Sequence, residues 1–70
     1  MKNLEFELTD EYIDLIKLLK ATSLAESGSM AKELVNSGLV KVNGEVESRM
    51  RRKIYPDFTV EFEEYLIKVV

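Results

Sequence analysis

The stretch from Ser27 to Lys53 reads SGSMAKELVNSGLVKVNGEVESRMRRK and contains the signals that decide the fold. Ser27 can cap a helix, because its hydroxyl accepts a hydrogen bond from one of the backbone N–H groups that a first turn leaves unpaired. Gly38 stands where a left-handed residue would close the same helix. The apolar residues between them recur at helical spacing and form one face: Met30, Ala31, Leu34 and Val35. The stretch therefore predicts a helix between Ser27 and Gly38.

A hairpin is predicted directly after this helix, because Asn43-Gly44 supplies the positive φ angles of a tight turn at little steric cost. A three-residue loop would pair apolar Val40 with apolar Val46 across the strands. A two-residue loop would instead place Val42 opposite the acidic Glu45. We favour the three-residue loop, because it pairs apolar side chains and also brings opposite charges together.

The flanking segments carry weaker signals for further elements. Alternation of apolar and polar residues predicts strands over Leu4–Leu8, Phe58–Phe62 and Tyr65–Val70. The apolar spacing within Ile13–Ala21 predicts a short first helix. Only residues 22–26 separate this helix from Ser27, so the two helices are expected to lie side by side.

The length of 70 residues indicates one small domain spanning residues 1–70. A chain of this size buries a modest fraction of its surface, so a binding surface is expected rather than a deep catalytic cleft. The chain contains no cysteine and no histidine, which removes disulfides, thiolate or imidazole metal sites, and triads with a histidine base. We therefore expect a protein that is not an enzyme and that uses no metal ion and no cofactor.

The net charge of −3 is distributed unevenly along the chain. Residues 1–16 carry one lysine and five acids, residues 17–53 carry eight bases and four acids, and residues 54–70 carry one lysine and four acids. The middle segment is therefore basic between acidic flanks, which keeps a nucleic-acid partner possible despite the overall charge. The alternating start is no signal peptide, and no apolar run approaches the roughly 20 residues of a membrane span. We expect a cytoplasmic protein without a membrane partner.

Four basic residues stand close together at the end of the central stretch, at Arg49 and Arg51–Lys53. A run of charge is often only a solvated loop. Because no acid separates Arg51 from Lys53, the mutual repulsion favours an anion nearby. The run is therefore a candidate contact for phosphate.

One set of residues carries a resemblance to a known family: Leu15, Leu19, Lys20, Leu24, Ser27, Ala31, Lys32, Leu34, Val35, Gly38, Val40, Val42, Asn43, Gly44 and Val46. In this pattern the chain resembles the RNA-binding domain first defined in ribosomal protein S-four, also called the alpha-L motif. The resemblance covers about residues 12–62. It is strongest to short free-standing bacterial members, the YaaA-like proteins, which often continue with Glu-x-Arg and a basic run, as Glu47-Ser48-Arg49 and Arg51–Lys53 do here.

The resemblance implies an α+β fold with two short helices packed on a small, mostly antiparallel sheet. It also implies binding of structured RNA, in particular ribosomal RNA, by the helix pair and the hairpin. The residues expected to contact RNA are Lys20, Ser27, Gly28, Ser29, Lys32, Lys41, Arg49, Arg51, Arg52 and Lys53. Asn43 and Gly44 are expected to act in the turn.

The chain departs from the family pattern at the start of the first helix. Many members have Arg-Leu-Asp there, whereas this chain has Asp14-Leu15-Ile16. The change removes one expected phosphate contact and adds an acid. Members often have arginine after the capping serine as well, where this chain has Gly28.

Two other functions are compatible with the sequence. A protein-interaction module would pair with its partner through exposed strand edges. A DNA-reading helix-turn-helix is less favoured, because Lys32 and Glu33 are the only charged residues within Ala31–Ser37, where base-reading side chains would be needed.

Overall fold

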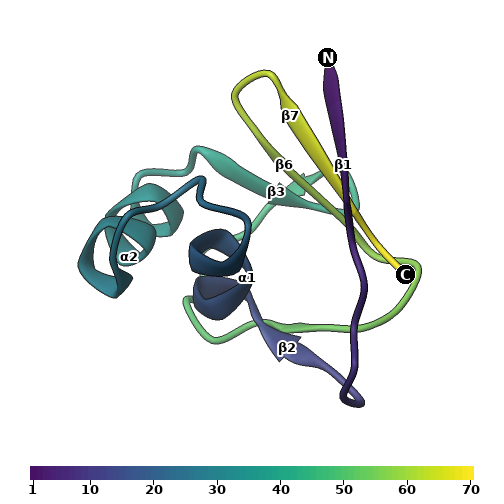
Figure 1. Cartoon of the computed structure of the whole chain (residues 1–70). Helices are drawn as coiled ribbons and strands as arrows, with labels where there is room; N and C mark the ends of the chain where they lie inside the picture. The colour runs from purple at the N-terminus through teal and green to yellow at the C-terminus, as the bar shows by residue number, and fades with distance from the viewer.

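Two helices lie on one face of a five-stranded sheet in the computed structural model, which describes residues 1–70 (Figure 1). The elements in chain order are β1 Lys2–Phe6, β2 Ile13–Asp14, α1 Leu15–Ala21, α2 Gly28–Asn36, β3 Val40–Val42, β4 Glu45–Val46, β5 Lys53–Ile54, β6 Thr59–Phe62 and β7 Tyr65–Val69. The main sheet has the order β1-β7-β6-β3-β4, and β2 and β5 form a separate antiparallel pair. The β1–β7 pair is parallel, and the other pairs are antiparallel. The predicted α+β fold is therefore confirmed.

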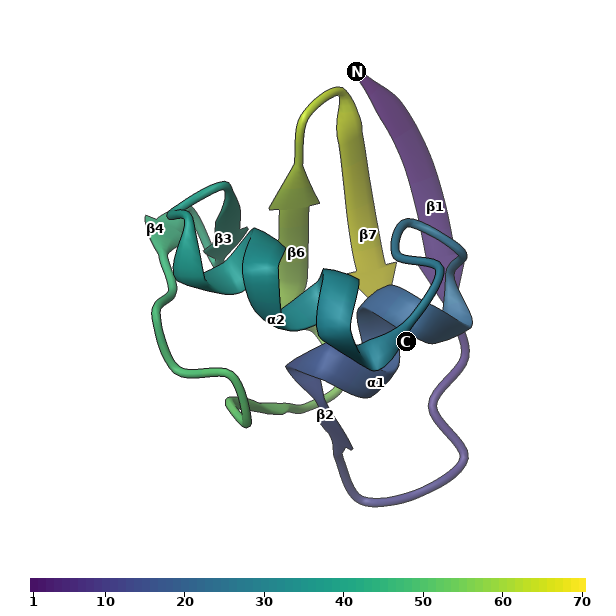
Figure 2. The ribbon, with the colours of Figure 1, turned by 90° about the vertical axis from the view of Figure 1, so that its left-hand side faces the viewer.

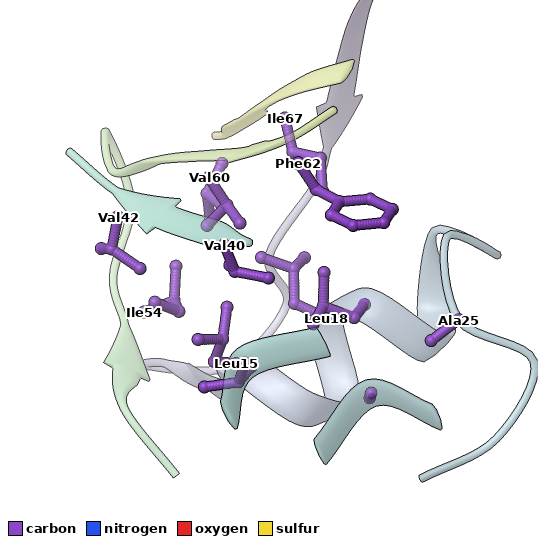
Figure 3. Packing of buried hydrophobic residues seen from close by; sticks show 13 residues of the cluster. Leu15, Leu18, Ala25, Val40, Val42, Ile54, Val60, Phe62 and Ile67 are labelled. Carbon is purple, nitrogen blue, oxygen red and sulfur yellow. The ribbon is translucent and has the colours of Figure 1, made fainter. Parts of the chain in front are cut away.

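The core fills the space between the sheet and the helices. Figure 2 shows both helices in front of the sheet, so the opposite face of the sheet is uncovered. Alternate residues of β3, β6 and β7 meet the buried positions of the helices (Figure 3). The buried apolar residues are Leu15, Leu18, Leu19, Ala25, Ala31, Val35, Val40, Val42, Ile54, Val60, Phe62, Ile67 and Val69.

The signals at both ends of α2 are confirmed. The Ser27 side-chain oxygen accepts a hydrogen bond from the Met30 N–H at 3.1 Å. Gly38 has a φ of 76°, and its N–H donates to the Val35 carbonyl at 3.2 Å. The following N–H, of Leu39, donates to the Leu34 carbonyl at 3.3 Å, which completes the two-bond closure typical of a left-handed glycine after a helix.

The predicted apolar face of α2 is only partly buried. Ala31 and Val35 are fully buried, Leu34 is half-buried, and Met30 is 39% exposed. Met30 thus lies at the edge of this face, because the buried stripe of the helix is narrower than the set of its apolar positions.

The predicted register of the hairpin is wrong. Val42 lies opposite Glu45 and Lys41 opposite Val46, so the loop has two residues. Asn43 and Gly44 have φ angles of 52° and 86°, as in the hairpin turns that match the twist of the strands. The Asn43 side chain accepts a hydrogen bond from the Thr59 N–H at 2.9 Å, and the Asn43 N–H donates to the Thr59 carbonyl at 2.8 Å. These two bonds join the turn to β6.

The first helix begins two residues later than predicted. Ile13 and Asp14 pair with Ile54 and Lys53 in the β2–β5 ladder, and α1 starts at Leu15. Strand β1 is also shifted, to Lys2–Phe6, although Leu4 and Phe6 still pack against the core as their alternation indicates.

Candidate functional site

Side chains from three separate segments line an open groove of about 580 Å³, which we call the basic groove. Its lining residues are Asp14, Ile16 and Lys17 at the start of α1, Lys32 on α2, and Ser48, Met50 and Arg51 in the loop between β4 and β5. Three of the side chains are cations and one is an acid. Ile16 and Met50 also pack against the hydrophobic core, so the lining of the groove combines apolar surface with charge.

A second hollow of about 420 Å³ adjoins the basic groove. It is lined by Arg49, Arg51, Arg52, Lys53 and Tyr55. Arg51 lines both hollows. The two therefore form one continuous basic surface along the loop between β4 and β5.

Glu47 gives this loop its conformation. Glu47 is 8% exposed, and its carboxylate accepts hydrogen bonds from Arg49 Nε at 3.0 Å, Arg49 Nη2 at 3.1 Å and the Arg49 backbone N–H at 3.0 Å. Arg52 Nε forms an ion pair with the same carboxylate at 3.3 Å. The hydrogen bonds from Arg49 lower the pKa of Glu47, against the opposing effect of burial. The anion expected beside the basic run is therefore supplied in part by the chain itself.

The four basic residues of the loop differ in how firmly the fold holds them. Besides its contact with Glu47, Arg52 has its guanidinium carbon 5.5 Å from the centre of the Phe58 ring. Lys53 Nζ lies 4.9 Å from the centre of the Tyr12 ring, where a cation is attracted to the ring face. Arg51 is exposed and forms no ion pair. The charges of Arg51 and Lys53 are thus available at the surface, whereas Arg52 stabilises the loop through its contacts with Glu47 and Phe58.

The amino end of α2 lies one turn from the basic groove. Ser29 precedes Lys32 by three residues, so the two lie on the same side of the helix. The N–H groups of Gly28 and Ser29 belong to the first turn, which has no partners for them within the helix. The Ser27 hydroxyl already accepts the capping hydrogen bond.

Two predicted contact residues lie apart from the groove. Lys20 is exposed in the last turn of α1 and lines neither hollow. Lys41 lies between the inward-facing Val40 and Val42, so its side chain is on the uncovered face of the sheet, opposite Glu61. The structure therefore does not bring these two lysines together with the others.

Sequence reasoning missed Lys17 and Glu47. Lys17 lines the basic groove, and the available signal was its position on the polar side of the first helix. Glu47 stands two residues before Arg49, and the Glu-x-Arg spacing was visible in the sequence. The pairing of one carboxylate with two arginines was not visible, because it depends on how the loop folds back.

The two acidic flanks differ in their position relative to the basic surface. Asp10 and Glu11 line a hollow together with Asp14 and Lys17, which also line the basic groove. Glu63 and Glu64 form the β6–β7 turn at the top of Figure 1, whereas β2, beside the loop that carries the basic run, lies near the bottom. Neither helix is long and apolar enough to cross a membrane.

The fold and the basic groove are those of a small α+β domain with a concave cationic surface. The family model described as the S4 domain matches residues 6–70, and the chain belongs to this family. The resemblance stated from the sequence is therefore confirmed.

Two curated relatives and one solved structure show the same relationship. The chain is 42% identical over 59 residues to YbcJ of Escherichia coli strain K12, which is named as a candidate RNA-binding protein; the match covers 84% of each protein. It is equally similar to the uncharacterised protein YbcJ of Shigella flexneri. The solution structure of YbcJ from E. coli, described as an αL motif involved in RNA binding, superposes with a TM-score of 0.70 at 37% identity, covering 100% of this chain and 87% of that one.

Proposed function

We propose that this protein binds structured RNA without catalysing a reaction, and that it does so through the basic groove and the hollow beside it. The observation that carries the proposal is the convergence of Lys17, Lys32 and Arg51 from three segments on one concave surface, in a chain of net charge −3. The αL motif of YbcJ, described as involved in RNA binding, supports the same function.

The chemistry of the surface fits RNA phosphates. Lysine and arginine neutralise phosphate charge and release counterions, and unpaired N–H groups at Gly28 and Ser29 can donate to a phosphate near Lys32. Paired RNA presents phosphates and ribose hydroxyls more readily than base edges. The surface would therefore read the shape of the RNA more than its sequence.

We further propose that the target is ribosomal RNA and that the protein acts in the cytoplasm. The family resemblance to the RNA-binding domain of ribosomal protein S-four supports this target. Crosslinking in cells followed by sequencing of the bound RNA tests it directly. We expect ribosomal RNA to be enriched. Recovery of only other structured RNAs would contradict ribosomal RNA as the target but would still support binding of structured RNA.

Salt dependence provides the test of RNA binding itself. We expect Arg51→Ser combined with Lys53→Ser to reduce the slope of log affinity against log salt by about 1.5, because each neutralised phosphate contributes roughly 0.7 to 0.9. Arg52 is left in place because its contacts with Glu47 and Phe58 hold the loop. Binding to a ribosomal RNA fragment would be measured between about 50 and 200 mM salt.

The matched control removes two lysines far from the groove. Lys2 pairs with Glu64 beside the β6–β7 turn, and Lys68 lies on the uncovered face of the sheet. Lys2→Ser combined with Lys68→Ser makes the same change in net charge and should leave the slope within about half a unit. Equal slopes for wild type and both double variants would contradict the proposal, and a protein-interaction module using exposed strand edges would then be favoured.

A further inference from the structure

Asp14 is the one acid that lines the basic groove, and it also lines a neighbouring hollow with Asp10 and Glu11. It occupies the N-cap position of α1, with φ −68° and ψ 142°, yet its side chain makes no capping hydrogen bond. It also takes part in none of the ion pairs, which join Lys2 to Glu64 and Glu47 to Arg49 and Arg52. The side chain is half-buried and lines the basic groove. A carboxylate here opposes phosphate binding without stabilising the helix through a cap, so its place in the groove needs another explanation.

The groove has a suitable size and lining to hold a small ligand that Asp14 would contact. Its volume of about 580 Å³ lies within the range of about 300 to 1,000 Å³ typical of small-molecule sites. Ile16 and Met50, which pack against the core, contribute apolar and polarisable surface to its lining. The stems of Lys17, Lys32 and Arg51 extend this surface while their charged ends remain in water. Such a site suits a flat ring with a polar edge that is attached to a phosphate.

We propose that the basic groove holds one unpaired guanine nucleotide of the bound RNA, an inference that rests on the proposed function. The base lies against Ile16 and Met50, and the flanking phosphates lie among Lys17, Lys32 and Arg51. The Asp14 carboxylate accepts hydrogen bonds from guanine N1–H and N2–H.

Guanine is distinguished from the other bases by its hydrogen-bond donors. An ionised carboxylate only accepts hydrogen bonds, and it has two oxygens to do so. Guanine presents two neighbouring donors on its Watson–Crick edge, whereas adenine, cytosine and uracil each place acceptors beside their donor there. Unpaired bases in loops and bulges are the ones that proteins recognise on this edge. Asp14 therefore adds base specificity to a surface that otherwise reads shape.

The experiment compares hairpin RNAs that differ at one position. Each hairpin has the same stem, either fully paired or with one bulged nucleotide that is G, A, C or U. We expect wild type to bind the bulged-G hairpin about tenfold more tightly than the bulged-A hairpin, in line with the discrimination that a bidentate contact to a base provides. We expect Asp14→Asn, which keeps the shape of the side chain and a good N-cap residue, to reduce this preference to less than about twofold.

Asp10→Asn is the matched control, because it removes one negative charge from an exposed aspartate outside the groove. It should retain the full preference for guanine. Equal binding of the paired and bulged hairpins by wild type would overturn this inference and leave the proposed function standing. A guanine preference that survives Asp14→Asn would overturn it as well. Failure to bind any hairpin, together with an absent salt slope, would overturn the proposed function and this inference with it.

Discussion

Single side chains fix the loop that carries the basic surface. The carboxylate of Glu47 receives three hydrogen bonds from Arg49 and an ion pair from Arg52. These contacts fix the backbone on both sides of Arg51, which itself forms no ion pair. Glu47 thus determines where Arg51 lies.

We expect Glu47→Gln to lower the free energy of unfolding by about 1 kcal/mol at neutral pH, or the Tm by about 4 to 8 °C. The value is modest because the Arg49 side chain is 68% exposed and water screens the pair. The pKa of Glu47 is lowered in the folded state by the hydrogen bonds from Arg49. The contribution of ionised Glu47 to the free energy of unfolding is therefore complete above the usual glutamate pKa of about 4.3. It is lost as the pH falls through the lower pKa that Glu47 has in the folded protein.

Thermal melts of wild type and Glu47→Gln from pH 7 down to about pH 3 measure this effect. The difference in Tm should shrink over the acidic part of that range. Glu45→Gln is the control, because Glu45 is exposed and forms no ion pair. A Tm difference that stays constant to the lowest pH would mean that the Glu47 charge does not stabilise the loop.

The turn between β3 and β4 likewise depends on a single residue, Gly44, through its backbone conformation. Its φ is 86° and an added Cβ would meet no atom within 4 Å, so the cost of Gly44→Val is backbone strain alone. We expect a loss of at least about 1 kcal/mol, measured by urea unfolding. Gly28→Ala, also without a neighbour within 4 Å but in helical conformation, should cost nothing or stabilise slightly. Equal effects of the two variants would rule out strain at Gly44 as the cause.

At the scale of elements, local signals predicted α2 and the strands of the main sheet, with shifted ends, but they did not predict the β2–β5 pair or the register of the hairpin. The cap at Ser27 and the closure at Gly38 depend on neighbouring residues only. The hairpin register depends on the bonds between Asn43 and Thr59, and the start of α1 depends on the pairing of β2 with β5. Neither partner can be identified from periodicity, because both lie many residues away in the sequence.

The two sides of α2 should respond differently to truncation. Val35 is fully buried, and Val35→Ala should cost about 2 kcal/mol through lost burial and the cavity left behind. Lys32 is exposed, and Lys32→Ala should change stability by less than about 0.5 kcal/mol while weakening binding to RNA. Urea unfolding and RNA titration of both variants provide the measurements. A similar loss of stability in the two would contradict the assignment of the groove side of α2.

At the scale of the whole molecule, the basic surface is local and the remainder of the chain is acidic. The net charge of −3 results largely from acids in the β6–β7 turn and in the first segment of the chain. The acids of the turn lie away from the loop between β4 and β5, whereas Asp14 of the first segment lines the groove beside that loop. A long polyanion is therefore repelled from most directions and attracted from one. The distribution was readable from the sequence as a basic middle segment, but the convergence of three segments on one groove required the fold.

The position of β7 in the sheet also determines when folding can finish. Tyr65–Val69 lies between β1 and β6 and pairs with both, although most of the sequence lies between β1 and β7. Bringing β1 and β7 together costs the entropy of ordering the long segment between them before their pairing can stabilise the fold. On the ribosome, β1 must therefore remain without its partner until β7 has emerged, whereas the pairs that β3 forms with β4 and β6 do not involve β7.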